Sequence, residues 1–371
     1  MRKKLCMLAC TILLGVTTLA GCSKAKETTS KETTVTPTET VTQEVTPTEE
    51  VKPTEEATPT QEASEESALE QVAEKITIPI AGLKGPTSMG LVSMVDLSAQ
   101  GMTANNYELT VAGAADEITA GIIKGEYPIA AIPCNLASVL YAKSNGAIKV
   151  AGINTLGVLY IVETGDSIHS VEDLKGKTIY STGKGTTPEY TLNYLLKSHG
   201  LDPEKDVTIE YKTEATEVAA ILSQSDDAIA MLPQPYVTTV MMNNDKVHVA
   251  LDITKEWEAA SKNDSTVVTG VVVVNTKFLE ENKDAVDDLL KEYEQSVNYA
   301  NAEVEATAEL VEKYGIIKKG VAMKAIPNCN IVMLQGDEMK KKVSAYLQVL
   351  FDQEPNSVGG SMPDDNFYYI P

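Results

Sequence analysis

Strand-like and helix-like segments alternate along residues 75–351, and this alternation constrains the fold more than any other feature of the sequence. Short β-branched runs, such as 76–80 and 148–153, are each followed or preceded by a stretch with apolar residues at helical spacing. Strands that alternate with helices in this way predict parallel β-α-β units. Roughly 300 residues exceed what one apolar core normally holds, so we expect two α/β lobes.

The chain is expected to cross twice between these lobes, near 158–165 and near 267–272, and the two crossings would form a hinge. Thr87 or Ser88 is the expected N-cap of a helix that runs to residue 100. Acidic helical segments over 283–314, with a break, and a helix over 337–351 complete the predicted core. We predict one lobe from residues 75–164 plus 268–371 and the other from 165–267.

The first 74 residues differ from the rest in composition. Residues 1–22 combine a basic start with an apolar run too short for a comfortable membrane span, which is typical of a secretory signal. Their end, Leu19-Ala20-Gly21-Cys22, resembles a bacterial lipobox, in which the cysteine is lipidated and becomes the mature N-terminus; an ordinary cleaved signal is the alternative. Residues 23–74, rich in Thr, Glu and Pro, are predicted to be a disordered tether.

Charge and residue usage exclude several functions. The net charge of −22 disfavours nucleic-acid binding, because so acidic a chain repels phosphate backbones. The only arginine is Arg2, so the predicted lobes lack the guanidinium that usually clamps carboxylates and phosphates. Two cysteines, Cys134 and Cys329, remain beyond the N-terminal segments, and the sequence leaves their pairing open.

We expect no metal, cofactor or catalytic residue. His169, His199 and His248 are scattered, and no two of them have the sequence spacing of metal ligands. The loop 183–187 fails the phosphate-loop pattern, because Thr178 stands where that pattern needs a glycine. Trp257, the only tryptophan, is expected in the core of a lobe.

Candidate ligand-binding residues lie where predicted strands end and helices begin. In open α/β sheets ligands bind at the carboxyl ends of strands, next to helix N-termini that offer free amides. The candidates are Gly85, Pro86, Thr87, Ser88, Cys134, Asn135, Lys184, Gly185, Thr186, Thr187, Tyr190, Gln234, Tyr236, Thr269 and Asn330.

The lipobox, the tether and three loops resemble the substrate-binding lipoproteins of ABC importers, within the branch that binds nitrate, sulfonates, taurine and thiamine precursors. The loops are Lys84–Gly90, Gly183–Tyr190 and Leu232–Pro235, and the resemblance covers about residues 75–350. It implies the type II periplasmic-binding-protein fold, with a ligand cleft between two α/β lobes. It also implies a permease and its ATPase as partners, attachment to the cell membrane through the N-terminal lipid, and a monomer.

Two classes of small solute fit the candidate residues. Hydroxyls and amides at Thr87, Ser88, Thr186 and Thr187 would hold an oxoanion such as a sulfonate or nitrate. A heteroaromatic solute would instead stack on Tyr190 or Tyr236 and bond to the amides of Asn135, Gln234 or Asn330. Two alternatives to solute delivery are a surface adhesin or sensor with the same fold, and an enzyme similar to pyrimidine synthases.

Overall fold

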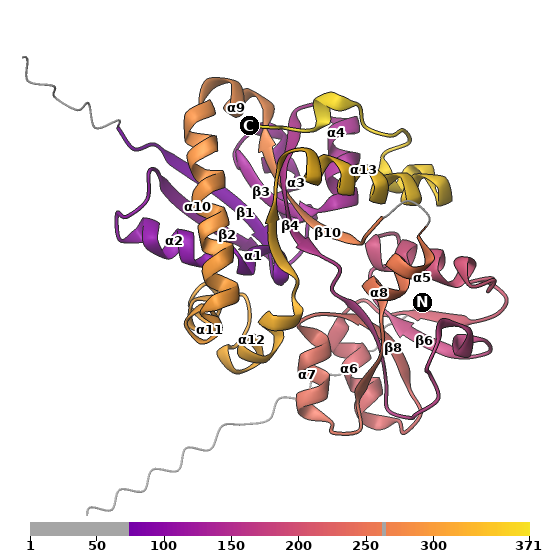
Figure 1. Ribbon diagram of the computed structural model, residues 1–371. Helices are drawn as coiled ribbons and strands as arrows, with labels where there is room; N and C mark the ends of the chain where they lie inside the picture. The colour runs from indigo at the N-terminus through magenta and orange to yellow at the C-terminus, as the bar shows by residue number, and fades with distance from the viewer. Residues whose placement is uncertain (1–73, 262–264) are drawn as a thin grey trace, which may run out of the picture. The chain divides into compact units, whose positions relative to one another are not determined.

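A computed structural model describes residues 74–261 and 265–371 and places their strands in two sheets (Figure 1). The predicted signal segment, the lipidation of Cys22 and all but the last residue of the predicted tether lie outside these ranges. Within them, no helix is long and apolar enough to cross a membrane.

The first sheet has six strands in the order β11-β4-β10-β3-β1-β2. Its strands are β1 (Thr77–Leu83), β2 (Asn106–Ala112), β3 (Ile129–Pro133), β4 (Ile148–Leu156), β10 (Val268–Asn275) and β11 (Ile331–Leu334). Its helices are α1 (Pro86–Met89), α2 (Val92–Ala99), α3 (Asp116–Lys124), α4 (Cys134–Lys143), α9 (Thr276–Glu281), α10 (Lys283–Ala302), α11 (Val304–Lys313), α12 (Lys319–Ala325) and α13 (Gly336–Gln353). Three short 3-10 helices accompany them, η2 (Ile326–Asn328), η3 (Pro355–Val358) and η4 (Asp365–Phe367). We call this the first lobe.

The second sheet has five strands in the order β7-β6-β8-β5-β9 and forms the second lobe. Its strands are β5 (Leu159–Glu163), β6 (Thr178–Ser181), β7 (Thr208–Tyr211), β8 (Ile229–Pro233) and β9 (His248–Asp252). Its helices are η1 (Val171–Leu174), α5 (Thr187–Ser198), α6 (Ala215–Gln224), α7 (Tyr236–Asn243) and α8 (Ile253–Ala260). The chain enters this lobe through Gly157 and Val158, just before β5. The predicted domain boundaries remain a prediction.

The predicted parallel β-α-β units are present in both lobes, since β1 pairs in parallel with β2 and β3, and β6 with β7 and β8. The strands next to the crossings are antiparallel: β10 to β3 and β4, and β5 to β8 and β9. A strand that enters from the other lobe arrives without a covering crossover helix, so it need not run parallel to its neighbours. Both sheets are therefore mixed.

The predicted start of the first helix is wrong. Gly85, at φ 133°, occupies the N-cap and Pro86 begins α1, which suits proline because the first helical amide needs no partner. The hydroxyl of Ser88 donates instead to the carbonyl oxygen of Leu83, at 2.7 Å. The predicted helix over 87–100 is also interrupted after Met89, where Gly90 allows close approach: a Cβ there would lie 2.9 Å from Cγ2 of Val297. The predicted break within 283–314 is confirmed at Glu303.

The apolar cores link the lobes. One buried cluster includes side chains from both sheets, among them Ile132 of β3, Ile161 of β5 and Trp257 of α8. Two further clusters belong to the outer faces, one in each lobe. Helix α13 contacts α4 and β4 of the first lobe and also α5 of the second, as Figure 1 shows near its yellow end. The C-terminal part of the chain therefore packs against both sheets.

Candidate functional site

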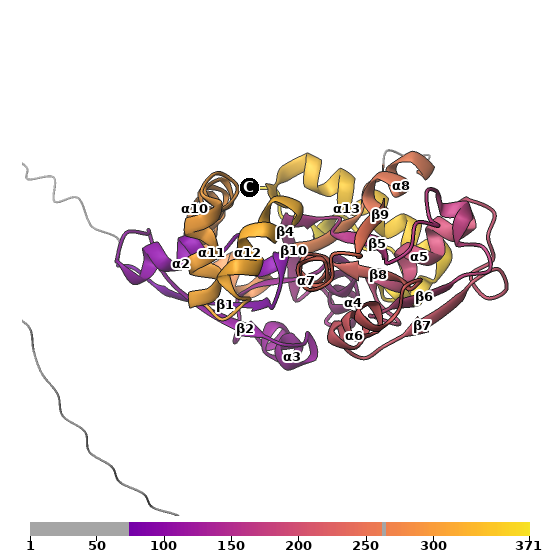
Figure 2. The same cartoon turned by 90° about the horizontal axis from the view of Figure 1, so that it is seen from below.

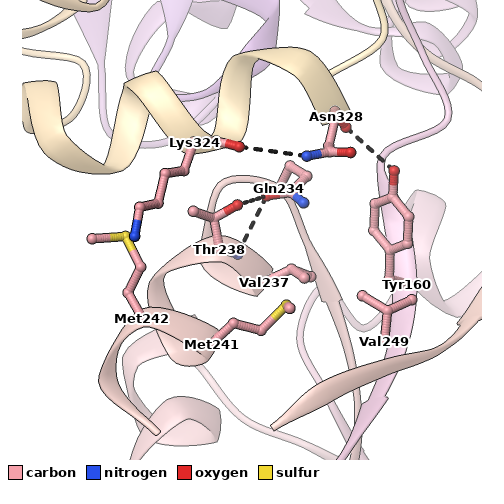
Figure 3. A pocket seen from close by; sticks show the side chains of 9 residues that line it. All are labelled: Tyr160, Gln234, Val237, Thr238, Met241, Met242, Val249, Lys324 and Asn328. Carbon is pink, nitrogen blue, oxygen red and sulfur yellow. Dashed lines mark hydrogen bonds between the residues drawn. The ribbon is translucent and has the colours of Figure 1, made fainter. Parts of the chain in front are cut away.

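Helix α7 of the second lobe contacts α12 of the first (Figure 2). A cavity of about 390 Å³ opens between the lobes on this side (Figure 3). We call it the interlobe cavity. The second lobe contributes residues from β5, β9, the β8–α7 connection and α7 itself, and the first lobe contributes residues from α12 and η2. The lining residues are Tyr160, Gln234, Val237, Thr238, Met241, Met242, Val249, Lys324 and Asn328.

Gln234 lies at the carboxyl end of β8, where a buried strand meets the start of α7, and its peptide bond to Pro235 is cis. Its Oε1 accepts hydrogen bonds from the hydroxyl of Thr238 at 2.8 Å and from the amide of Thr238 at 3.3 Å. A backbone amide can only donate, so this pair of bonds fixes which end of the side chain is the oxygen. The Nε2 group of Gln234 makes no hydrogen bond within residues 74–261 and 265–371 and is free to donate to a ligand.

The first lobe supplies the only charged side chain among the lining residues, Lys324. Figure 3 shows its side chain extending from α12 along the edge of the interlobe cavity. Lys324 forms no ion pair with any described residue, whereas neighbouring Lys319 is paired with Glu305 and Glu309. An ammonium without a carboxylate partner attracts an anionic group on a ligand.

Tyr160 of the second lobe and Asn328 of the first are in direct contact across the interlobe cavity. The phenol of Tyr160, on β5, donates to the backbone oxygen of Asn328 at 3.3 Å. Burial, followed by the nearby carboxylate of Asp252, raises the pKa of Tyr160 to about 12. The phenol therefore stays protonated and able to donate at neutral pH.

This shift predicts a measurable loss of stability in alkali. An unfolded tyrosine has a pKa of about 10, so above that pH the unfolded chain releases a proton that folded Tyr160 retains. The contribution to stability is complete below pH ~10 and falls as the pH rises toward 12. We expect Tyr160→Phe to reduce the decline of the urea midpoint between pH 9 and 11. The exposed Tyr299→Phe is the control, and an equal effect of both variants would contradict the assignment.

The remaining wall is largely apolar. Val237, Met241, Met242 and Val249 line it, and the last three are partly exposed to solvent. Methionine side chains are flexible and adapt to apolar groups of differing shape. The interlobe cavity thus combines an apolar surface with one ammonium and one amide donor, which suits a small molecule that has a polar or anionic end.

Most of the predicted ligand residues lie outside the interlobe cavity; of the fifteen, only Gln234 lines it. The backbone oxygen of Thr87 accepts a bond from Nδ2 of Asn154 at 3.0 Å, next to the crossing strands. Asn330 bonds the carbonyl of Gly157 and so holds the first crossing in place. Tyr236 is the first residue of α7 and is partly exposed.

A second polar region lies at the crossing strands β4 and β10. Three buried oxygens there have no hydrogen-bond partner among the described residues: Asn154 Oδ1, Thr155 Oγ1 and Thr269 Oγ1. Of these residues, only Thr269 was among the ligand-binding candidates predicted from the sequence. Asn154 and Thr155 lie at the carboxyl end of the apolar strand β4. That position is the sequence feature that could have identified them as candidate ligand-binding residues. Buried polar atoms without partners are uncommon and mark places where a ligand or water can bond.

The predicted residues at the starts of α4 and α5 contact one another. The hydroxyl of Thr187 donates to Oδ1 of Asn135 at 3.1 Å, joining the second lobe to the first. Cys134, beside Asn135, is fully buried and faces the apolar core. Cys134 and Cys329 are both free thiols, and burial raises the pKa of each.

The loop before α5 is held by its own contacts. The amide of Gly185 donates to the carboxylate of Glu189, and the hydroxyl of Thr186 donates to the carbonyl oxygen of Gly183 at 2.6 Å. Lys184 lies over the ring of Tyr211, 6.0 Å from its centroid. Tyr190 is partly buried against the shared core. These contacts are sufficient to hold the loop in its conformation in the absence of a ligand.

Comparison with known proteins agrees with this architecture. Residues 137–306 match the model of a family described as NMT1/THI5 like. Comparison with curated protein sequences finds no match. A solved structure of an ABC transporter from Parabacteroides distasonis is 25% identical, with a TM-score of 0.66, and the alignment covers 79% of this chain and 98% of that one.

Two further structures share the fold at lower identity. The periplasmic aliphatic sulphonate binding protein of Escherichia coli is 16% identical, with a TM-score of 0.65 over 80% of this chain and 92% of that one. A structure titled desulfurization enzyme is 13% identical, with a TM-score of 0.55 over 80% and 97%. The predicted two-lobed periplasmic-binding-protein fold is therefore confirmed. The chain thus resembles the NMT1/THI5-like family over residues 137–306 and shares its fold with the Parabacteroides ABC transporter structure and the periplasmic sulphonate-binding protein.

Proposed function

We propose that the protein is an extracytoplasmic solute-binding lipoprotein of an ABC importer. It captures a small solute between its lobes and delivers it to a permease driven by an ATPase, while a lipid on Cys22 holds it at the membrane. The observation that carries this proposal is the interlobe cavity, because both lobes line it and each contributes a polar side chain, Lys324 from the first lobe and Gln234 from the second. A cavity of this size and mixed polarity is typical of small-molecule sites.

The lining favours an oxoanion with an apolar portion, such as a small alkanesulfonate, over a heteroaromatic solute. Lys324 and the Nε2 group of Gln234 would bind the anionic end, and Met241 and Met242 would contact the apolar part. The two tyrosines predicted to stack on a ring, Tyr190 and Tyr236, do not line the cavity. The sulphonate-binding protein of Escherichia coli, which shares the fold, supports the same class.

Calorimetric titration of the full-length chain with alkanesulfonates, nitrate and pyrimidines tests this proposal. We expect an alkanesulfonate to bind and to raise the melting temperature, as a ligand specific to the folded state must. Lys324→Met and Gln234→Leu should each weaken binding about 10-fold or more, since a charged or hydrogen-bonding contact is lost. Lys341→Met, on the exposed face of α13, is the matched control. The proposal fails if no solute binds, or if Lys324→Met behaves like the control.

We propose capture without chemical conversion, although one structure with this fold is titled an enzyme. None of the nine lining residues is a histidine, cysteine or carboxylate. The two described cysteines are buried and have raised pKa values, which disfavours the reactive thiolate. Recovery of the bound solute unchanged after prolonged incubation is the expected result.

A further inference from the structure

The pairing of β5 with β9 brings together three potential metal ligands that are far apart in the sequence. Glu163, at the end of β5, is the register partner of His248, at the start of β9. Asp166 follows in the loop after β5. One ligand atom from each residue lies within 4.8 Å of the other two. Sequence spacing could not reveal this group, because strand pairing creates it.

Glu163 supplies an independent reason to expect a cation. Its side chain is only 1% exposed, and it receives hydrogen bonds from the amides of Ser167 and Ile168 and from the hydroxyl of Ser167. Among the described residues, its only potential ion-pair partner is His248, which is charged only when protonated. Buried carboxylates are normally paired with a cation or bound to a metal. If His248 is neutral, the buried carboxylate of Glu163 has no cationic partner among the described residues.

The geometry at His248 fits metal binding better than a direct hydrogen bond. Its Nε2 lies 3.8 Å from Oε1 of Glu163, which is too far for a hydrogen bond. Two ligand atoms that share one tetrahedral Zn²⁺ ion, each about 2.0–2.2 Å from it, lie about 3.4 Å apart, so a shift of a few tenths of an ångström brings both to one ion. The other ring nitrogen, Nδ1, faces the carbonyl oxygen of Lys246 at 3.5 Å, an arrangement that leaves the Nε2 lone pair for a metal.

We propose that Glu163, Asp166 and His248 form a binding site for a divalent transition-metal ion of the Zn²⁺ class. One imidazole and two carboxylates favour such an ion over Ca²⁺ or Mg²⁺, which prefer oxygen ligands alone. His169 is a fourth candidate ligand, because its Nε2 lies 3.9 Å from Oδ1 of Asp166. The ion ties the edge strand β9 to β5 and to the loop that follows β5. None of the site's residues lines the interlobe cavity, although Val249 next to His248 does, and zinc binding can be measured without any solute.

The experiment is a titration of the full-length chain, made without a polyhistidine tag and stripped with EDTA. Cys6, Cys10 and Cys22 are replaced by serine in every sample, because they lie outside the described residues and thiolates bind Zn²⁺. We expect one Zn²⁺ per chain, measured by calorimetry, and visible absorption bands of a bound ion when Co²⁺ is used instead. Ca²⁺ should bind at least about 10-fold more weakly, since imidazole is a poor calcium ligand.

Two variants and one control decide the outcome. His248→Gln and Asp166→Asn should each weaken Zn²⁺ binding about 10- to 100-fold or more. Loss of a residue that only hydrogen-bonds to a metal ligand already weakens binding by this amount, and these two residues are ligands themselves. Neither side chain is buried, since Asp166 is 86% exposed and His248 is 44% exposed, so the variants should fold. His199→Gln is the control, because His199 faces one carboxylate, Glu172, at 2.8 Å, and is not part of a three-residue group of potential ligands among the described residues. Absence of Zn²⁺ binding, or equal binding by His248→Gln and His199→Gln, overturns the proposal and leaves protonated His248 as the partner of Glu163.

Discussion

Replacement of Trp257 by alanine is expected to lower the free energy of unfolding by about 3–5 kcal/mol, the cost of removing a large buried aromatic side chain. Trp257 is fully buried on α8, 4.2 Å from the ring centroid of Tyr194 on α5 and 5.5 Å from that of Tyr346 on α13. Its Nε1 group donates to the hydroxyl of Ser265 at 3.3 Å. The variant leaves a cavity where helices of both lobes meet.

Circular dichroism during urea unfolding measures this loss, because the chain has a single tryptophan and the variant has no indole fluorescence. Trp257→Phe keeps an aromatic ring and should lose less than half as much stability. Tyr299→Ala, at a partly exposed position on α10, should cost under about 1 kcal/mol. If Trp257→Ala is as stable as Tyr299→Ala, the packing of Trp257 between the lobes contributes little to the free energy of unfolding.

The second large effect is expected at Gly82, where the end of β1 lies against α1. A Cβ at Gly82 would stand 2.2 Å from Oγ of Ser88 but 3.4 Å from its Cβ, so only the hydroxyl blocks it. Gly82→Ala should therefore cost about 1–3 kcal/mol through overpacking. Ser88→Ala should cost about 1–2 kcal/mol, because it removes the hydrogen bond to the partly buried carbonyl of Leu83.

The double variant tests the physical cause. With the hydroxyl gone, the added methyl group fits, so Gly82→Ala with Ser88→Ala should be less destabilised than the sum of the single variants by about 1–2 kcal/mol. Gly320→Ala, within α12, is the control: a Cβ there meets nothing within 4 Å, and alanine favours a helix. If the losses in unfolding free energy of the two single variants simply add, the Ser88 side chain rotates away from the new methyl group. The contact between them would then not be the cause of the destabilisation.

The fold could be predicted because its signals are local. The apolar runs of β3, β8 and β10 and the helical periodicity of α10 follow from residues adjacent in sequence. Strand direction at the crossings could not be predicted in the same way, because β5 and β10 owe their antiparallel pairing to entry from the other lobe. The burial of Trp257 was predicted correctly, but its position at a junction of both lobes was not.

The candidate site was harder to predict because its residues come from segments remote in sequence. Gln234 stands at a strand end, where the rule about carboxyl ends applies, and it lines the interlobe cavity. Lys324 lies on a short amphipathic helix and resembles any exposed lysine until α12 is placed opposite α7. Met241 and Met242 resemble core residues, and only the fold reveals that they face a cavity. The Glu163–His248 pair likewise depends on the register of β5 and β9.

Helix α13 restricts how a molecule can enter and leave the interlobe cavity. It packs on α4 and β4 of the first lobe and on α5 of the second, so the lobes cannot separate along that flank without breaking buried contacts. Fewer interactions join the lobes on the α7–α12 flank, chiefly the hydrogen bond from Tyr160 to the backbone of Asn328. In the proposed function, the solute would therefore enter and leave through the α7–α12 opening, and the permease would receive it from that flank.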